Sequence, residues 1–288
     1  MKRFIYLIII LLLLSIFTFY CSNYFVSAPR TKVSLNKIKL TAGTYNIHIG
    51  KGIDNQINLK RIADVIIENN TDVIGVQEVD RFTIRSGKID QFEELKKLTN
   101  MNGIFGKSID YQGGEFGIGI FTSGEILKWS HNLHPLGEEK ERRSFIAALI
   151  ATKDDFSFWA VNTHLGLVGK DRKTQANTII EFVKSLKEPV ILLGDFNEKP
   201  DVKSGIYESL SQTFLDCWLT SKSRIVFNES TDEFISKGYT YPSNQPSERI
   251  DYIWLRKNDG WETEKCWITK TQASDHLPFF VCITNNLK

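Results

Sequence analysis

The stretch LLGDFNEKP, residues 192–200, raises the question on which the interpretation of the whole chain depends: why an acid and an amide stand where a buried strand ends. An apolar run typical of a buried strand leads without a break into Gly-Asp-Phe-Asn. Because alternate side chains of an extended chain point to opposite faces, Phe196 is expected to return to the core while Asp195 and Asn197 face outward together. An acid and an amide are thereby placed side by side where a buried strand surfaces.

Other apolar strands of the chain end in polar residues of the same narrow chemical set. Each residue alone is more simply explained as a turn former, a local backbone partner or a core histidine. Together they indicate a common centre, because burying such groups beside apolar strands is costly unless they satisfy one another or a shared ligand. Besides Asp195 and Asn197, they are Asn46 in TYNIHIG, Glu78 in VIGVQEVD, His164 in VNTHLG, Asp251 in RIDYIWL, and Asp275 with His276 in SDHLPFF.

The chemistry of this set favours a metal-dependent reaction. Glu78, Asp275 and the amide of Asn46 offer hard oxygen ligands that suit Mg²⁺, Mn²⁺ or Ca²⁺. The two histidines of the set suit proton transfer near neutral pH. The sequence contains no serine or cysteine in a nucleophile-elbow motif. We therefore expect metal-assisted attack of water on phosphorus rather than a covalent acyl mechanism.

Apolar spacing along the chain predicts a strand-rich α/β domain. Asp90 with Glu93 forms a capping-box-like start for one helix. Consecutive strands are too close together for helical crossovers, which indicates antiparallel pairing within a mixed-sheet α/β sandwich. The last third is expected to consist of strands and loops. Helices are expected around residues 59–66, 92–98 and 176–186, and strands around 38–50, 72–80, 116–123, 142–152, 156–166 and 190–197.

The first 21 residues are predicted to be an export signal or a membrane anchor. A short basic start precedes an unbroken apolar run from Phe4 to Tyr20, at the lower limit for a membrane span. A small-residue cleavage site is present at residues 26–28, but Pro29 directly after it disfavours cleavage. We therefore expect a retained anchor, with the domain exported to the periplasm or the cell surface.

The remaining N-terminal features set the expected domain boundaries. Lipidation would use Cys21, yet Tyr20 is bulky where small residues are expected. Residues 22–37 are polar and interrupted by turn-forming residues. They are predicted to be a tether, followed by one folded domain over residues 38–288. Four basic residues in and just after this tether weaken the case for export: Arg30, Lys32, Lys37 and Lys39.

Composition narrows the possible functions. Lys and Arg (36) nearly balance Asp and Glu (34), so the chain lacks the basic excess of a protein that holds nucleic acid mainly by neutralising phosphates. The cysteines have no zinc-finger spacing. Cys217 and Cys266 could form a disulfide in an oxidising compartment, or they could be two unrelated buried thiols.

The motifs GDFN, RIDYI and SDH in series, supported by QE and THL, resemble those of the endonuclease/exonuclease/phosphatase superfamily. This superfamily includes deoxyribonuclease I, abasic-site endonucleases, inositol-phosphate phosphatases and neutral sphingomyelinases. The resemblance covers the chain from about Ile38 to its C-terminus. It implies an α/β (α+β) four-layer sandwich, in which two packed mixed β-sheets are flanked by helices and the site lies at one mouth.

The resemblance implies roles for the residues around the metal and the attacking water. Glu78 would be the principal metal ligand, with Asn46 and Asp275 close to the ion. Asp195 and Asn197 would orient or deprotonate the water and hold a phosphate oxygen.

It also implies roles for two histidines. His276 backed by Asp251 would form one acid/base pair. His164 would stabilise the pentavalent phosphate or act as the second acid/base, with Glu115 in YQGGEFG resembling its carboxylate partner. A turn acid after two glycines is an equally good explanation of Glu115.

Tyr111 would contact the substrate, and Arg143 would clamp the phosphate, with Arg142 as an alternative and a solvated charge run as the competing explanation. We expect a monomeric metal-dependent phosphodiesterase whose substrate is a nucleic acid or a phospholipid head group. A phosphomonoesterase of the same fold and a non-catalytic binding module are the alternatives.

Overall fold

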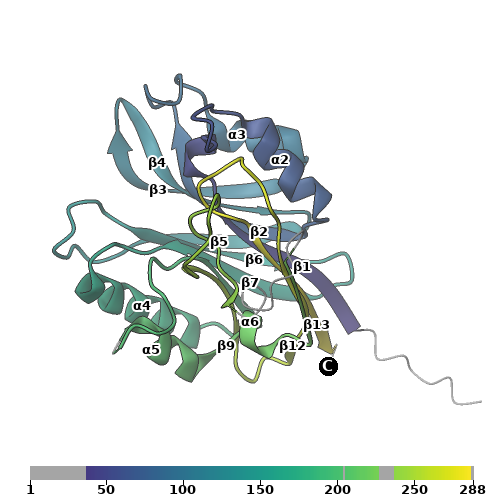
Figure 1. Cartoon of the computed structure of the whole chain (residues 1–288). Helices are drawn as coiled ribbons and strands as arrows, with labels where there is room; N and C mark the ends of the chain where they lie inside the picture. Colours follow the sequence, from purple (N-terminus) through teal and green to yellow (C-terminus); the bar gives the residue numbers. More distant parts are fainter. Residues whose placement is uncertain (1–36, 204, 227–236, 287–288) are drawn as a thin grey trace, which may run out of the picture. The chain divides into compact units, whose positions relative to one another are not determined.

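A computed structural model of the chain describes residues 37–203, 205–226 and 237–286 (Figure 1). The predicted anchor, residues 1–21, lies outside these residues, as does the predicted tether up to residue 36. In the part of the chain that the structure describes, no helix has both the length and the apolar character needed to cross a membrane.

The first sheet has seven strands in the order β10-β12-β13-β1-β2-β4-β3. β1 pairs in parallel with β2 and antiparallel with β13, so the sheet is mixed. Its strands are β1 (Lys37–Asn46), β2 (Val73–Arg81), β3 (Asn102–Tyr111), β4 (Gly114–Thr122), β10 (Ser223–Val226), β12 (Trp261–Ile268) and β13 (Phe279–Asn286).

The second sheet has six strands in the order β5-β6-β7-β8-β11-β9. β7 and β8 are parallel, whereas β11 runs antiparallel to β8. Its strands are β5 (Glu125–Leu133), β6 (Ser144–Ala151), β7 (Ser157–His164), β8 (Val190–Asp195), β9 (Phe214–Asp216) and β11 (Asp251–Arg256).

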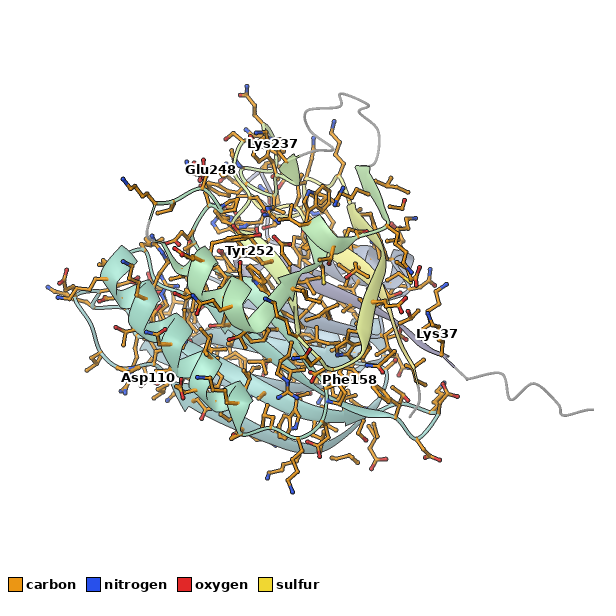
Figure 2. All side chains as sticks on the ribbon, turned by 90° about the horizontal axis from the view of Figure 1, so that it is seen from below. Lys37, Asp110, Phe158, Lys237, Glu248 and Tyr252 are labelled. Atoms are coloured by element: carbon orange, nitrogen blue, oxygen red, sulfur yellow. The ribbon has the colours of Figure 1, made fainter. Side chains whose placement is uncertain are left out.

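Helices cover the outer face of each sheet and complete four layers (Figure 1). Apolar residues fill the space between the sheets and the space between each sheet and its helices. Phe158 belongs to the core between the sheets and Tyr252 to the core under α4 and α5 (Figure 2). The predicted four-layer α/β sandwich is thus confirmed. The helices are α2 (Leu59–Glu68) and α3 (Gln91–Thr99) on the first sheet, α4 (Gly169–Lys184) and α5 (Ile206–Thr213) on the second, and the short η1 (His48–Gly50) and α6 (Cys217–Thr220).

A local sequence signal explains where α3 begins. The Asp90 side chain accepts a hydrogen bond from the Glu93 backbone N–H (3.1 Å), as expected for the start of α3. The prediction that the last third contains only strands and loops was wrong, because α5 and α6 lie there. α5 is short, and its buried residues Ile206 and Leu210 pack into the core beside the second sheet, so tertiary contacts rather than local propensity stabilise it.

Cys217, Cys266 and Cys282 are buried free thiols. The Cys266 thiol donates a hydrogen bond to the backbone carbonyl of Cys217 (3.1 Å). Of the two interpretations left open by the sequence, the structure therefore has separate thiols and no Cys217–Cys266 disulfide.

Candidate active site

Asp195 lies at the centre of a row of polar side chains on three neighbouring strands. It ends β8 and stands in register with His164 at the end of β7 and with Asp251 at the start of β11. Because β7 and β8 are parallel, their carboxyl ends meet at one sheet edge. A side chain at Gly194 would collide with the backbone carbonyl of Thr163, which explains the glycine before Asp195.

The two residues after Asp195 follow the predicted alternation. Phe196 is buried and packs edge-to-face against Tyr252, with 5.5 Å between ring centroids. Asn197 lines the cavity, and its φ of 51° lies in the left-handed region that asparagine tolerates better than most residues. Its backbone N–H donates to Asp195 Oδ1 (2.9 Å), and its Nδ2 donates to the Leu165 carbonyl (2.8 Å). Hydrogen bonds therefore fix both the backbone and the side chain of Asn197.

A backbone irregularity in β2 directs Glu78 toward the same place. The register of β2 against β4 shifts between Val76 and Val79, and Glu78 has a φ of 59°. Such bulges turn a side chain out of the regular alternation. Asn46, the last residue of β1, donates from Nδ2 to Glu78 Oε1 (2.9 Å) and to Asp195 Oδ2 (3.0 Å). One amide thus joins the carboxylates of the two sheets.

A second buried polar pair, Gln77 and Asn162, joins the two sheets. Gln77 Nε2 donates to Asn162 Oδ1 (2.7 Å), and Asn162 Nδ2 donates to the carbonyls of Val76 (3.1 Å) and Gly119 (2.8 Å). Both side chains are fully buried. Sequence reasoning missed this pair, although an asparagine on an inward position of an otherwise apolar strand was a usable signal.

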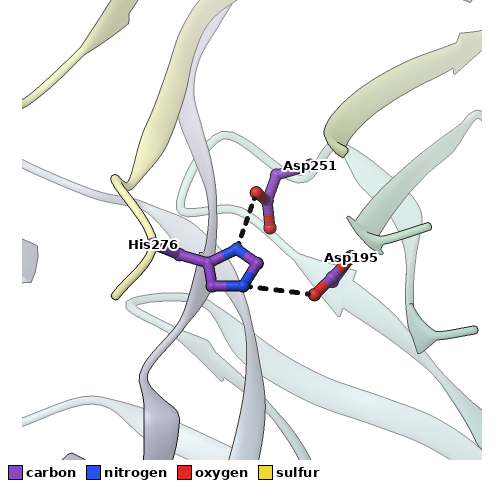
Figure 3. A group of neighbouring side chains, drawn as sticks. All are labelled: Asp195, Asp251 and His276. Carbon is purple, nitrogen blue, oxygen red and sulfur yellow. Dashed lines mark hydrogen bonds and ion pairs between the residues drawn. The ribbon is translucent and has the colours of Figure 1, made fainter. Parts of the chain in front are cut away.

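His276 lies between two aspartates (Figure 3). Its Nδ1 is 3.0 Å from Asp251 Oδ2, and its Nε2 is 3.7 Å from Asp195 Oδ2. Asp251 also accepts a hydrogen bond from the Thr240 hydroxyl (2.6 Å). Ligand atoms of Asp195, Asp251 and His276 lie within 4.8 Å of one another, a separation that would allow them to share an ion. Because both ring nitrogens of His276 face carboxylates, the arrangement also suits proton transfer.

Burial and charge shift the pKa values of this group. Burial lowers the pKa of His276, but the charges of Asp251, Asp195 and Asp275 outweigh it and raise the pKa to about 10. Burial and the charge of Asp251 raise the pKa of Asp195, and the charge of His276 and the hydrogen bond from Asn46 offset part of this rise. His276 is therefore a cation at neutral pH, and Asp195 is a stronger base than an exposed aspartate.

His164 is held in the opposite protonation state. Burial, followed by the charges of Arg143 and His276, lowers its pKa well below the ordinary value, so its imidazole is neutral. Arg143 Nη1 lies 3.2 Å from both ring nitrogens, and His164 Nε2 is 3.6 Å from Asp195 Oδ2. Arg143 Nη2 donates to Glu139 (2.8 Å), which fixes the guanidinium.

The predicted pairing of Glu115 with His164 was wrong. Glu115 stands opposite Arg81 in the pairing of β4 with β2, and its carboxylate reaches Arg81 Nη1 (3.3 Å) and Lys107 Nζ (3.9 Å). The hydrogen bond and ion pair described for His164 are instead with Arg143 and Asp195. The register of a hairpin decides which cation an acid meets, and this register is not visible in the motif YQGGEFG.

The remaining site residues gather around one cavity of about 510 Å³. Asn46 and Asp251 are not among the described lining residues but contact them. Asn46 is hydrogen-bonded to Glu78 and Asp195, and Asp251 to His276. Five carboxylates, two arginines and the His276 cation line the cavity, so its lining is acidic overall. The predicted residues in the described lining are Glu78, Tyr111, Arg143, His164, Asp195, Asn197, Asp275 and His276, and those that sequence reasoning missed include Arg85, Glu141, Tyr241 and Glu248.

Arg85 is the cation of this cavity that sequence reasoning missed. Its Nε and Nη2 donate to Asp80 Oδ2 and Oδ1 (2.8 Å each). Its guanidinium carbon lies 4.4 Å from the ring centre of Tyr111 and 5.0 Å from that of Phe116. Partial burial lowers the pKa of Arg85, but Asp80, with smaller contributions from Tyr111 and Glu78, raises it above its ordinary value. Arg85 is therefore a fixed, permanently charged group.

A two-sheet α/β sandwich with acids and imidazoles gathered at one edge defines a class of hydrolase folds. The chain belongs to the endonuclease/exonuclease/phosphatase family, whose model matches residues 43–276. This match confirms the resemblance carried by the GDFN, RIDYI and SDH motifs.

Solved structures with the same fold share little sequence with this chain. A family protein from Bacteroides thetaiotaomicron has a TM-score of 0.72 and 19% identity, covering 87% of this chain and 99% of that one. A mannosyl-6-phosphatase from the same species has a TM-score of 0.68 and 19% identity, with coverage of 85% and 99%. The human Nocturnin catalytic domain has a TM-score of 0.63 and 18% identity, with coverage of 86% and 96%. A comparison with curated proteins finds no match.

A divalent cation fits the donor atoms beside Asn46, in keeping with the general metal dependence of the family. Glu78 and Asp275 are partly exposed carboxylates of the cavity lining, and such oxygens are the ligands that hard divalent cations prefer. Asn46 turns its Nδ2 toward Glu78, while its Oδ1 accepts from the His48 backbone N–H (3.0 Å). Asn46 therefore fits a role in orienting the carboxylate better than its predicted role as a ligand.

Proposed function

We propose that this chain is a metal-dependent phosphoester hydrolase that activates water for in-line attack on phosphorus. The family consists of hydrolytic phosphoesterases, which supports an enzyme of this general kind. The observation that carries the proposal is the Asn46 amide, which places Glu78 and Asp195 in one cavity beside His276 and its partner Asp251. A binding module would need only part of this arrangement.

The roles of the residues follow from their protonation states. A divalent ion held by Glu78 and Asp275 would polarise a phosphoryl oxygen. Asp195, whose basicity burial raises, orients the attacking water and accepts its proton. The His276 cation, fixed by Asp251, donates to the charge that develops on the phosphoryl group or the leaving oxygen.

A phosphodiester of small size is the proposed substrate. A cavity of about 510 Å³ with an acid-rich lining suits a compact molecule, such as a phospholipid head group, better than a nucleic acid backbone that binds mainly through cations. A phosphomonoester is the second candidate. The similarity of this fold to that of a mannosyl-6-phosphatase favours it.

Hydrolysis of four substrates tests the proposal: bis-(p-nitrophenyl) phosphate, p-nitrophenyl phosphate, plasmid DNA and sphingomyelin. Each is assayed with Mg²⁺, Mn²⁺ or Ca²⁺ and again with EDTA, using E78Q as the matched variant with weakened metal binding. The proposal predicts metal-dependent turnover that EDTA abolishes and that E78Q lowers when the metal concentration is limiting. Turnover that survives chelation would eliminate the metal mechanism, and a lack of turnover of any phosphoester would favour a binding module.

We also propose that residues 1–21 anchor the chain in a membrane and that the folded domain lies outside the cytoplasm. The apolar run from Phe4 to Tyr20 supports this. Membrane fractionation of the full chain, with protease added to intact cells, tests both points. Recovery of the uncleaved chain in the soluble cytoplasmic fraction would refute the anchor.

A further inference from the structure

The side chain of Arg85 is fixed by Asp80 and also lines the cavity, which distinguishes it from an arginine with a purely structural role. Asp80, which holds it, is fully buried, and Thr83 donates a hydrogen bond to this carboxylate (2.6 Å). The guanidinium therefore rests on a fixed support, with the ring of Tyr111 beneath it. The pair with Asp80 uses Nε and Nη2, so Nη1 is the donor group that remains for a ligand in the cavity.

The neighbouring Arg81 shows what a structural arginine looks like in the same segment. Arg81 pairs with Asp90 (2.7 Å) and Glu115 (3.3 Å) and lies against the rings of Phe82 and Phe105. Its side chain is 27% exposed, close to the 31% of Arg85. The described lining of the catalytic cavity includes Arg85 but does not include Arg81.

The position of Arg85 relative to the proposed metal ligand decides what it could bind. Arg85 lines the same cavity as Glu78 and is close enough for the two charges to interact. A phosphoryl group held at Glu78 through a metal would carry negative oxygens into a lining dominated by carboxylates. Such a group needs cations in addition to His276, and the other arginine of the lining, Arg143, is already engaged by Glu139 and Glu141.

We propose that Arg85 is a substrate-binding residue that holds a phosphoryl group of the substrate through its Nη1 donors, and that Asp80 is the residue that positions it. The ring of Tyr111 provides a surface that supports the planar guanidinium. This inference rests on the proposed function of the cavity. It adds a recognition residue that belongs to none of the GDFN, RIDYI and SDH motifs.

The test measures binding of inorganic phosphate by calorimetry in the presence of Mg²⁺, together with KM and kcat for bis-(p-nitrophenyl) phosphate. R85A is expected to weaken phosphate binding and raise KM by about 10- to 100-fold, the range expected for one charged hydrogen bond, with little change in kcat. R85K is expected to fall between R85A and the wild type, because lysine keeps the charge but not the fork that Asp80 holds. R81A is the matched control and is expected to change neither phosphate binding nor KM.

Thermal unfolding of each variant shows whether it is folded. This control is needed because R85A leaves Asp80 buried without its partner. If R85A does not fold, D80N/R85M replaces it, since this double variant removes both charges together. Unchanged phosphate binding and KM in a folded R85 variant would overturn the inference. If the wild type hydrolyses no phosphoester, the proposed function fails, but the calorimetry still decides whether Arg85 binds phosphate.

Discussion

Replacing Asp195 with asparagine tests the centre of the proposed mechanism with almost no change in shape. One carboxylate oxygen accepts from the Asn197 N–H (2.9 Å), and the other faces Asn46 Nδ2 at 3.0 Å and His276 Nε2 at 3.7 Å. D195N keeps these atoms in place but removes the base. We expect kcat to fall by about 10²- to 10⁴-fold, or about 3 to 5 kcal/mol in the barrier, the usual contribution of a positioned acid or base.

The stability of D195N should change far less than its rate. The new amide N–H must face another donor, either Asn46 Nδ2 or the Asn197 N–H, which costs about 1 to 3 kcal/mol. Folding raises the pKa of Asp195, so the ionised carboxylate destabilises the folded state at neutral pH, and the neutral amide relieves this. The two effects oppose each other, and denaturant unfolding should show a net change of about 1 to 2 kcal/mol or less.

D216N is the matched control, because Asp216 is also a buried aspartate of the second sheet. It accepts hydrogen bonds from Arg249 (2.8 Å) and Tyr207 (2.6 Å) and is not among the described residues of the cavity lining. D216N should lose about 1.5 to 3 kcal/mol of stability and keep its kcat per folded molecule. If D195N instead turns over bis-(p-nitrophenyl) phosphate at a rate near that of the wild type, Asp195 is not the base and the mechanism is refuted.

Three further substitutions probe the metal, the imidazole and the support between the sheets. E78Q should raise the Mn²⁺ concentration for half-maximal activity by at least about tenfold, a loss typical even of outer-shell partners, and an unchanged titration would contradict its role as a ligand. D251N removes one of the three carboxylates that together raise the pKa of His276 to about 10, so the protonated form is lost at lower pH and the alkaline limb of the pH–rate profile should move to lower pH; a limb that stays in place would exclude His276 as the titrating group. N162L breaks the hydrogen bonds of Asn162 to Gln77 and to two backbone carbonyls, and chemical unfolding should show a loss of about 3 kcal/mol; a loss below about 1 kcal/mol would mean that the pair does not hold the sheets together.

The sequence was sufficient to predict that the polar strand ends would meet. A buried strand that ends in an acid must satisfy that acid, and Asp195 accepts hydrogen bonds from Asn46 and from the Asn197 N–H. His164 and Asp251 stand in register with it on the neighbouring strands. Phe196 is buried and Asn197 lines the cavity, as the alternation of an extended chain predicts, although β8 ends at Asp195 and Asn197 has a left-handed backbone. These features depend on local backbone rules, which a single sequence carries.

Features that depend on the register between strands could not be predicted in this way. Glu115 was placed beside His164 by motif, but the pairing of β4 with β2 sets it opposite Arg81. Arg81 and Arg85 stand only four residues apart in RFTIR and look equivalent in the sequence. Their environments differ because Arg81 still lies in β2, whereas Arg85 lies beyond the strand, where Asp80 and Tyr111 fix it in the cavity. A motif identifies which residue types are present, and the sheet register decides which of them meet.

Asn46 shows why the two kinds of information must be combined. Oxygen-ligand chemistry suggested that its amide would bind the metal directly, yet its nitrogen donates to Glu78 and Asp195 while its oxygen accepts from His48. Two carboxylates brought together at the edges of separate sheets repel each other, and a donor between them stabilises both without neutralising either. The amide thereby holds both carboxylates at one cavity, Glu78 where a cation would bind and Asp195 where it would meet a water molecule. N46D would replace that donor with a third negative charge, so it should impair folding and activity together, whereas a simple metal ligand would tolerate the acid.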